Sequence, residues 1–156
     1  MLYPLSYEGG MVAMVPPGPS VLGGRRYASA MGRLSVLVVD DDPVILRLLE
    51  VNFQLEGIEV ATAVDGEEGV EEARRTRPDV VISDIMMPKV NGLELLSMLR
   101  DDPLTAALPV ILLSAKAQAA DVQRGMELGA ADYITKPFDP LELIDRVYKV
   151  LAKSPR

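Results

Sequence analysis

The segment LSVLVVDDDP, residues 34–43, decides the fold of this chain. Its first six residues are apolar apart from Ser35, and three consecutive aspartates follow them. A run that is apolar throughout, rather than at alternate positions, is typical of a strand buried on both faces, as in a parallel sheet. Asp42 suits the N-cap of a helix and Pro43 its first residue. The segment therefore predicts a buried strand that leads directly into a helix.

Apolar residues at helical spacing mark the helix after this strand. Val44, Leu48, Val51 and Leu55 recur three or four residues apart, and Gly57 ends the segment. The last helix begins at a second Asp-Pro pair, at 139–140, and carries a similar apolar stripe: Leu141, Ile144, Val147, Tyr148 and Leu151.

The same strand-then-helix unit recurs between these two helices. Strands are predicted over residues 58–63, 79–83, 109–113 and 131–134, and helices over residues 65–75, 91–100 and 117–128. The helix over 117–128 is rich in alanine and weakly apolar, which predicts loose packing. Five such units need a parallel sheet with right-handed crossovers and helices on both faces, and they are too few for a closed eight-stranded barrel. The predicted fold is an α/β three-layer open sandwich.

The composition narrows the chemistry that the chain can perform. Its 156 residues include no histidine and no cysteine, and 16 Lys and Arg against 23 Asp and Glu give a formal net charge of −7. These absences exclude Ser-His-Asp and Cys-His catalysis, zinc sites with the usual ligands, disulfides and a phosphohistidine. Carboxylates, hydroxyls, lysines and a hard, oxygen-binding metal ion remain.

The same numbers describe a globular domain with an aliphatic core. The chain is 49% hydrophobic and 25% charged but only 4% aromatic, and its length is typical of one domain. An acidic surface argues against direct binding to nucleic acid. No apolar run approaches the ~18 residues of a membrane-spanning helix, so we expect no membrane insertion and a cytoplasmic location.

Residues 1–33 differ in composition from the rest of the chain. They hold six of the 12 Gly and four of the 12 Pro and show neither strand nor helix periodicity. They do not resemble a signal peptide, because no basic segment precedes an uninterrupted apolar stretch. We expect a disordered Gly/Pro-rich extension, or a dispensable leader upstream of a natural start at Met31. The extension has three arginines and one glutamate, which leaves a net charge of −9 on residues 34–156.

Polar side chains stand at the carboxyl ends of the predicted strands, where open α/β sheets bind ligands. They are Asp40 and Asp41 after the first strand, Asp84 after the third, Ser114 after the fourth and Lys136 after the fifth. Each has an ordinary explanation by itself: a helix cap, a loop carboxylate, a polar strand end or a solvated lysine. Their shared position, charge type and order make one joint site the stronger interpretation.

Four segments around these residues resemble the signature of one family. They are VVDDD at 38–42, DIMMP at 84–88, LSA at 113–115 and YITKPF at 133–138. In this order they are similar to the receiver domains of bacterial two-component response regulators, over residues 34–152. The resemblance implies a flavodoxin-like fold with strand order 2-1-3-4-5. It also implies that Asp84 is the phosphoacceptor for a phosphohistidine on a sensor histidine kinase or a phosphotransfer protein.

The resemblance implies a metal site as well. Mg²⁺ would be held directly by Asp41, Asp84 and the backbone carbonyl of Met86, and by Asp40 through a water molecule. Three clustered carboxylates repel one another, so without a cation at least one of them should have a raised pKa. The small, oxygen-preferring Mg²⁺ suits such a group.

Around the phosphoryl group, the resemblance assigns oxygen contacts to the Lys136 ammonium, the Ser114 hydroxyl and nearby backbone N–H groups. It implies a cis peptide before Pro137, and a switch in which Ser114 moves and Tyr133 rotates inward. The face built by the last two helices and the strand between them would then change and signal by contact with a downstream target protein.

We therefore expect residues 34–153 to be a receiver domain with no output domain in this chain, either stand-alone like the chemotaxis regulators or excised from a longer regulator. Its only catalysis would be its own phosphorylation and dephosphorylation, so it is not expected to be an enzyme. One alternative is an interaction module of the same fold that does not use phosphorylation. Another is a Mg²⁺-dependent phosphohydrolase with an aspartyl-phosphate, although that class usually has a second Asp where this chain has Met86. No P-loop or dinucleotide-binding glycine fingerprint follows a predicted strand.

Overall fold

The computed structural model describes residues 33–115 and 118–153. The predicted disordered extension lies outside these residues apart from Arg33. The chain forms two separate units, Met1–Arg33 and Leu34–Arg156, and the α/β fold belongs to the second.

Strands and helices alternate along the described residues. The strands are β1 (Ser35–Val39), β2 (Glu59–Ala63), β3 (Val80–Asp84), β4 (Val110–Ser114) and β5 (Asp132–Thr135). The helices are α2 (Pro43–Leu55), α3 (Gly66–Thr76), α4 (Gly92–Asp101), α5 (Ala119–Glu127) and α6 (Pro140–Lys153). Every predicted element is present, and the predicted ends differ from the observed ones by at most two residues. None of these described helices has both the length and the apolar character needed to cross a membrane.

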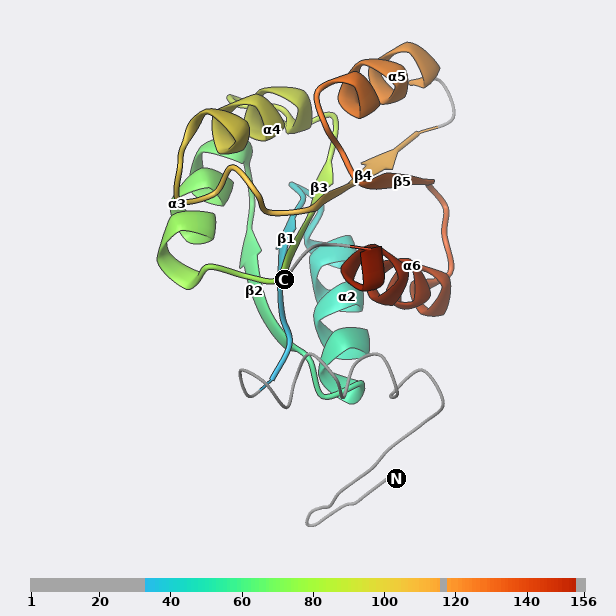
Figure 1. The fold of residues 1–156 in the computed structure, drawn as a ribbon. Helices are drawn as coiled ribbons and strands as arrows, with labels where there is room; N and C mark the ends of the chain where they lie inside the picture. Colours follow the sequence, from blue (N-terminus) through green and yellow to red (C-terminus); the bar gives the residue numbers. More distant parts are fainter. Residues whose placement is uncertain (1–32, 116–117, 154–156) are drawn as a thin grey trace. The chain divides into compact units, whose positions relative to one another are not determined.

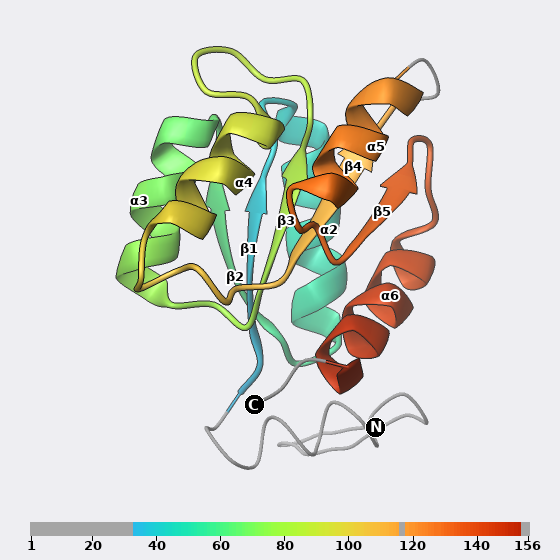
Figure 2. The ribbon, with the colours of Figure 1, turned by 45° about the horizontal axis from the view of Figure 1, so that its top comes forward.

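The five strands form one parallel sheet in the order β2-β1-β3-β4-β5. Helices α2 and α6 cover one face of it, and α3, α4 and α5 cover the other (Figure 1). Figure 2 shows the strands running side by side between these two layers. The predicted three-layer open sandwich and the implied flavodoxin-like strand order are both confirmed. The order reverses between β1 and β3, which is where ligands bind in sheets of this kind.

The central strands supply the middle of the core. Every residue of β3 and β4 is buried, as are four of the five residues of β1, because helices cover both faces of the sheet. The edge strands β2 and β5 keep exposed residues. Apart from Phe53, the buried apolar side chains are Val, Leu, Ile and Ala, so the predicted aliphatic core is confirmed.

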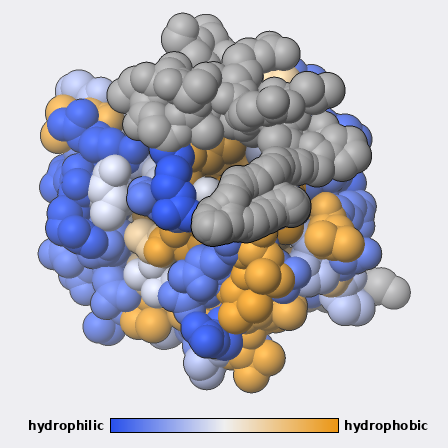
Figure 3. All heavy atoms as spheres, turned by 90° about the horizontal axis from the view of Figure 1, so that it is seen from below, coloured by the Kyte–Doolittle hydropathy of each residue, from blue (hydrophilic) through white to orange (hydrophobic). Residues whose placement is uncertain are grey.

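The apolar stripe that predicted α2 does not face the core. Its end residues, Val44 and Leu55, are 71% and 80% exposed, and its two middle residues are also exposed, whereas Leu49 and Phe53 are fully buried. The helix has apolar residues on two sides, so the spacing of its apolar residues alone does not predict which side packs against the sheet. Phe53 is the largest of the fully buried side chains and takes the core position. The predicted stripe of α6 faces inward except at Leu141, which is exposed. Figure 3 shows further hydrophobic areas, in orange, on one face of the surface.

Four of the five described helices begin with a side chain that caps their first turn. Asp42, Asp65, Asn91 and Asp139 each accept a backbone N–H from two or three residues later, at 2.8 to 2.9 Å. The caps predicted at Asp42 and Asp139 are therefore present. Helix α5 is the exception, because Gln118, which precedes it, makes no side-chain hydrogen bond to its first turn.

Helix α5 also packs weakly on the sheet, in agreement with its low apolar content. Its buried residue is Gly125. A Cβ at this position would stand 2.3 Å from the side chain of Leu112 and 3.2 Å from that of Leu93. The helix therefore approaches the sheet at a point where it has no side chain of its own to anchor it.

Three helices are followed by a residue in the left-handed region. Gly57 and Gly129 have φ angles of 79° and 102°, and Arg77, after α3, has a φ angle of 49°. A residue with a Cβ costs roughly 1–2 kcal/mol in this region, whereas glycine adopts it freely. Arg77 is therefore a point of local strain.

Replacing Arg77 with glycine should stabilise the protein. We expect the free energy of unfolding, measured by urea denaturation, to rise by about 0.5–1 kcal/mol because glycine removes the strain. The hydrogen bond from the N–H at this position to the Ala73 carbonyl is retained. The control, Glu71→Gly, changes an exposed position inside α3 and should lower the same quantity by about 1 kcal/mol. Equal losses in the two variants would contradict the strain at Arg77.

Candidate functional site

The carboxyl ends of four strands lie at one edge of the sheet and carry the predicted residues. Asp40 and Asp41 follow β1, Asp84 and Ser114 are the last residues of β3 and β4, and Lys136 follows β5. The parallel register between neighbouring strands aligns these ends. The fold thus brings Lys136 to Asp40, although 96 positions separate them in the chain.

Three carboxylates form a tight group at this edge. Oxygen atoms of Asp40, Asp41 and Asp84 lie within 4.8 Å of one another. Asp40 is fully buried and Asp84 is only 7% exposed, whereas Asp41 is exposed to solvent. The group therefore has one side in the protein and one side in water.

Both side-chain oxygens of the buried Asp40 have partners. Oδ1 accepts the backbone N–H of Asp42 at 2.9 Å, and Oδ2 accepts a hydrogen bond from Lys136 Nζ at 2.9 Å. A buried carboxylate is tolerated only when it is paired and hydrogen-bonded. These two hydrogen bonds offset the free-energy cost of removing the Asp40 carboxylate from water.

Lys136 joins the carboxylates from the end of β5. Its Nζ lies 2.9 Å from Asp40 Oδ2 and 3.4 Å from Asp84 Oδ2. Burial alone would lower the pKa of Lys136, but the hydrogen bond and charge of Asp40, with those of Asp84, outweigh burial and raise it. Lys136 is therefore a permanent cation in this site. The peptide bond between Lys136 and Pro137 is cis, as the resemblance implied.

Asp84 is the carboxylate whose ionised form is disfavoured. Burial, and after it the charge of Asp40, raise the pKa of Asp84 from 3.8 to about 6, although Lys136 acts in the opposite direction. One carboxylate thus has the raised pKa that was expected, but its burial contributes more than the repulsion from the neighbouring carboxylates. One ammonium does not balance three carboxylates, so the site keeps an excess of negative charge.

The donor set fits a Mg²⁺ ion. Mg²⁺ prefers oxygen ligands and usually combines one or two carboxylates with several waters. The three carboxylates supply such oxygens, the exposure of Asp41 leaves access for water, and the raised pKa of Asp84 reports negative charge that a cation would offset. Met86, the expected carbonyl ligand, follows β3 by two residues and has an exposed side chain.

The two expected switch residues lie in different surroundings. Ser114 is buried at the end of β4, and its backbone carbonyl accepts the N–H of Lys136 at 2.7 Å. Tyr133, on the edge strand β5, is 42% exposed, so its side chain lies on the surface rather than among the carboxylates. Arg146 of α6 donates to the Tyr133 carbonyl at 2.9 Å and forms an ion pair with Asp132.

One contact at this edge was not predicted from the sequence. The side chain of Gln118 accepts the backbone N–H of Ala115, the residue after Ser114, at 2.7 Å. Its signal in the sequence is the residue type, because a glutamine stands at the N-cap of α5 where Ser, Thr, Asp or Asn is usual. Asp65, after β2, is also buried, but it caps α3 and lies 3.7 Å from Lys89. The second strand therefore adds a structural carboxylate and no further member of the group.

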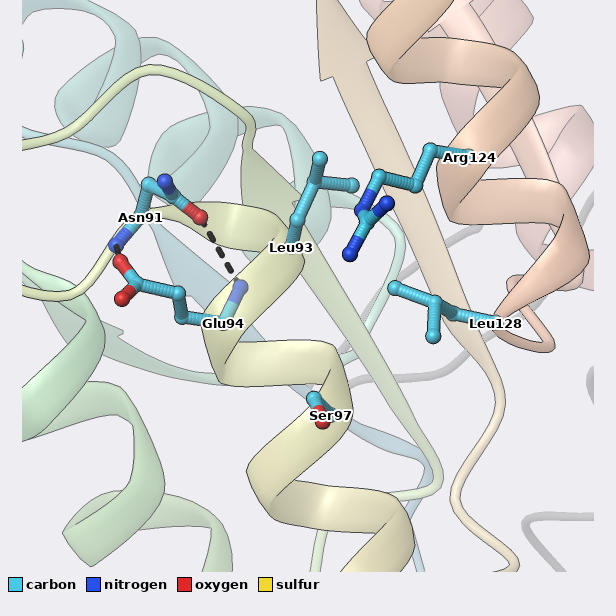
Figure 4. A pocket seen from close by; sticks show the side chains of 6 residues that line it. All are labelled: Asn91, Leu93, Glu94, Ser97, Arg124 and Leu128. Atoms are coloured by element: carbon cyan, nitrogen blue, oxygen red, sulfur yellow. Dashed lines mark hydrogen bonds between the residues drawn. The ribbon is translucent and has the colours of Figure 1, made fainter.

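A pocket of about 360 Å³ lies between α4 and α5 (Figure 4). Its lining includes none of the predicted site residues and consists of Asn91, Leu93, Glu94, Ser97, Arg124 and Leu128. The Asn91 and Glu94 side chains are already engaged in the capping box of α4. This pocket is therefore distinct from the carboxylate group.

The chain is similar to known proteins of one family. Residues 36–148 match the family model of the response regulator receiver domain. Over 119 residues the chain is 43% identical to the alkaline phosphatase synthesis transcriptional regulatory protein PhoP of Bacillus subtilis, and the match covers 76% of this chain and 49% of PhoP. The chain spans about half the length of the curated relatives it matches.

Solved structures lead to the same family. A putative response regulator from Chloroflexus aurantiacus matches with a TM-score of 0.73 at 38% identity, covering 77% of this chain and 98% of that one. The receiver domain of the sensor histidine kinase PA1611 from Pseudomonas aeruginosa has a magnesium ion coordinated in its active site cleft. It matches with a TM-score of 0.71 at 28% identity, covering 77% of this chain and 98% of that one. The resemblance read from the four sequence segments is thus confirmed, and the chain belongs to the family of response regulator receiver domains of two-component systems.

Proposed function

We propose that this protein accepts a phosphoryl group on Asp84 in a Mg²⁺-dependent reaction and then signals through contacts with a downstream target protein. The donor is the phosphohistidine of a sensor histidine kinase or of a phosphotransfer protein, because the chain has no histidine of its own. The observation that carries this proposal is the position of Asp84, at a strand end beside two further carboxylates and the Lys136 ammonium.

The reaction moves a phosphoryl group from nitrogen to oxygen. A carboxylate oxygen of Asp84 attacks phosphorus while the bond between phosphorus and the donor's imidazole nitrogen breaks, and the product is an acyl phosphate. With a pKa of about 6, Asp84 is mostly ionised at neutral pH and available as a nucleophile. Phosphoryl transfer otherwise depends on positioning and on neutralising charge.

Lys136 and the end of β4 provide that neutralisation. The Lys136 ammonium already lies 3.4 Å from Asp84, so it can pair with one oxygen of the incoming phosphoryl group. The Ser114 hydroxyl and the backbone N–H groups that follow it can bind another oxygen as charge-assisted donors. The Lys136 ammonium is in place before the reaction, whereas the Ala115 N–H is bonded to Gln118 in the structure and has to be released.

We assign the metal to the same edge of the sheet. Asp41, Asp84 and the Met86 carbonyl would hold Mg²⁺ directly, and Asp40 would act through water. A bound Mg²⁺ would offset the repulsion among the carboxylates and neutralise phosphoryl oxygens. The magnesium ion in the PA1611 receiver domain supports this assignment.

The output is a change in the surface formed by α5, β5 and α6. An acyl phosphate brings about 1.5 to 2 negative charges and three strong acceptors. Movement of Ser114 toward them opens space into which Tyr133 rotates, and the weakly held α5 is free to follow. Shifting a two-state switch from 1:99 to 99:1 takes about 5.5 kcal/mol, which several charge-assisted hydrogen bonds can supply.

We also propose that residues 34–153 are the receiver domain and that residues 1–33 are an extension outside it. The net charge of −9 on residues 34–156 favours protein partners over direct contact with nucleic acid. A cytoplasmic location fits a donor kinase that draws its phosphoryl group from ATP.

Asp84→Asn should abolish labelling by radiolabelled acetyl phosphate in the presence of Mg²⁺, because the amide is not a nucleophile toward phosphorus. The control, Asp145→Asn, removes an exposed carboxylate of α6 that pairs with Lys149 and should be labelled like the wild type. Labelling of Asp84→Asn at full stoichiometry would exclude Asp84 as the phosphoacceptor.

Asp41→Asn should weaken Mg²⁺ binding at least about tenfold in isothermal titration calorimetry, because it removes a charged ligand. Asp42→Asn is a matched control, since it makes the same charge change one position further along. Asparagine preserves the cap of α2, and Asp42 is not part of the carboxylate group. Equal losses of affinity would mean that net charge, and not ligation by Asp41, controls binding.

Asp84 should make the metal-free protein less stable as the pH rises. Its pKa is raised from 3.8 to about 6 in the folded state, so between these values the folded state binds more protons and the free energy of unfolding falls with increasing pH. In EDTA, Asp84→Asn should raise the free energy of unfolding by about 3 kcal/mol at pH 7.5, and by about 1 kcal/mol at pH 4.5. An effect of equal size at both pH values would show that the substitution acts through packing rather than through charge.

A further inference from the structure

Two hydrogen bonds join Ala115, the residue after β4, to Gln118, the residue before α5. Gln118 Oε1 accepts the backbone N–H of Ala115 at 2.7 Å, and the Gln118 N–H donates to the Ala115 carbonyl at 3.1 Å. The Gln118 side chain is thus bound to the residue that follows the site serine, and not to the helix that it precedes.

If the alternation of β4 is extended by one residue beyond its end at Ser114, the Ala115 N–H is directed toward β3 and Asp84. In a parallel sheet the backbone groups of successive residues face opposite neighbours. The Leu113 carbonyl accepts a hydrogen bond from Ile85, after β3, and the Ser114 carbonyl accepts one from Lys136, after β5. The same alternation turns the Ala115 N–H back toward β3, whose last residue is Asp84.

This N–H is one of the donors that an acyl phosphate on Asp84 would need. In the structure its hydrogen is already used by the neutral Gln118 amide. A phosphoryl group carries three oxygens and nearly two negative charges, and hydrogen bonds to ionised acceptors are about twice as strong as neutral ones. The phosphoryl group is therefore the stronger acceptor for the Ala115 N–H, and the hydrogen bond from this N–H to Gln118 is broken when the phosphoryl group binds.

We infer that Gln118 competes with the phosphoryl group for the Ala115 N–H, and that its release couples phosphorylation to the first turn of α5. This inference rests on the proposed function of Asp84. It assigns Gln118 as a positioning residue of the switch.

The way the helices begin supports this coupling. Among the described helices, α2, α3, α4 and α6 each have an N-cap side chain bonded to their own first turn. At α5 the corresponding side chain, that of Gln118, accepts a hydrogen bond from the Ala115 N–H and makes none to the first turn of the helix. The Gln118 carbonyl still begins the helix by accepting the Val122 N–H at 2.9 Å. A movement of Gln118 is therefore passed directly to α5, which has Gly125 as its buried residue.

Two substitutions should move the switch in opposite directions. The probe is beryllofluoride with Mg²⁺, a mimic of the phosphoryl group, and the measurement is its dissociation constant. Gln118→Met has a similar length but no amide oxygen, so the Ala115 N–H is free and binding should tighten about threefold to tenfold. Gln118→Glu holds the same N–H by a charge-assisted bond and repels the anion, so binding should weaken about tenfold or more. Gln123→Met, on the exposed side of α5, should bind like the wild type.

A second measurement does not depend on affinity. Without the probe, the Ala115 amide proton should exchange with solvent faster in Gln118→Met than in the wild type, because its acceptor is gone. A purely structural role would shift binding in the same direction for the Met and Glu variants, and that result, or unchanged binding in both, would overturn the competition. If the wild type neither binds beryllofluoride nor is labelled by acetyl phosphate, the proposed function itself is wrong.

Discussion

The excess of negative charge at the carboxyl edge of the sheet is the constraint on which the other features of the site depend. Asp40, Asp41 and Asp84 lie within 4.8 Å of one another and share one ammonium, Lys136. Repulsion of this kind would push flexible loops apart. It is sustained here because the strands that carry Asp40 and Asp84 are buried on both faces and cannot separate without opening the core. The packing of the core thus holds the three carboxylates together in spite of their repulsion, in the arrangement that the proposed cation and phosphoryl group need.

Much of the fold and most of the site could be predicted from the sequence, for physical reasons that are now visible. The central strands are uniformly apolar because helices cover both of their faces, so they stand out as short continuous runs. The site residues were found because a parallel sheet collects the carboxyl ends of its strands at one edge. Asp40, Asp84 and Lys136 could therefore be grouped before any distance was known. The raised pKa of Asp84 follows first from its burial and then from the charge of the neighbouring Asp40.

The features that sequence reasoning missed depend on tertiary packing. The apolar period of α2 predicted the helix but not which of its sides is buried. The side with Leu49 and Phe53 packs into the core, although the other side carries an equally regular apolar stripe. The bond between Gln118 and Ala115 depends on backbone outside the regular elements, which no periodic pattern describes. This contact lies beside Ser114, a residue of the proposed switch, and functional sites are where local sequence rules are expected to fail.

The ion pair between Lys136 and Asp40 joins residues that are 96 positions apart in the chain, so it is a long-range contact in folding. The pair forms only after β1, β3, β4 and β5 have been laid side by side, so no shorter fragment or half-assembled sheet contains it. Contacts of such high sequence separation are entropically costly and tend to form late. The proposed phosphoryl site is therefore expected to be complete only after these long-range contacts have formed.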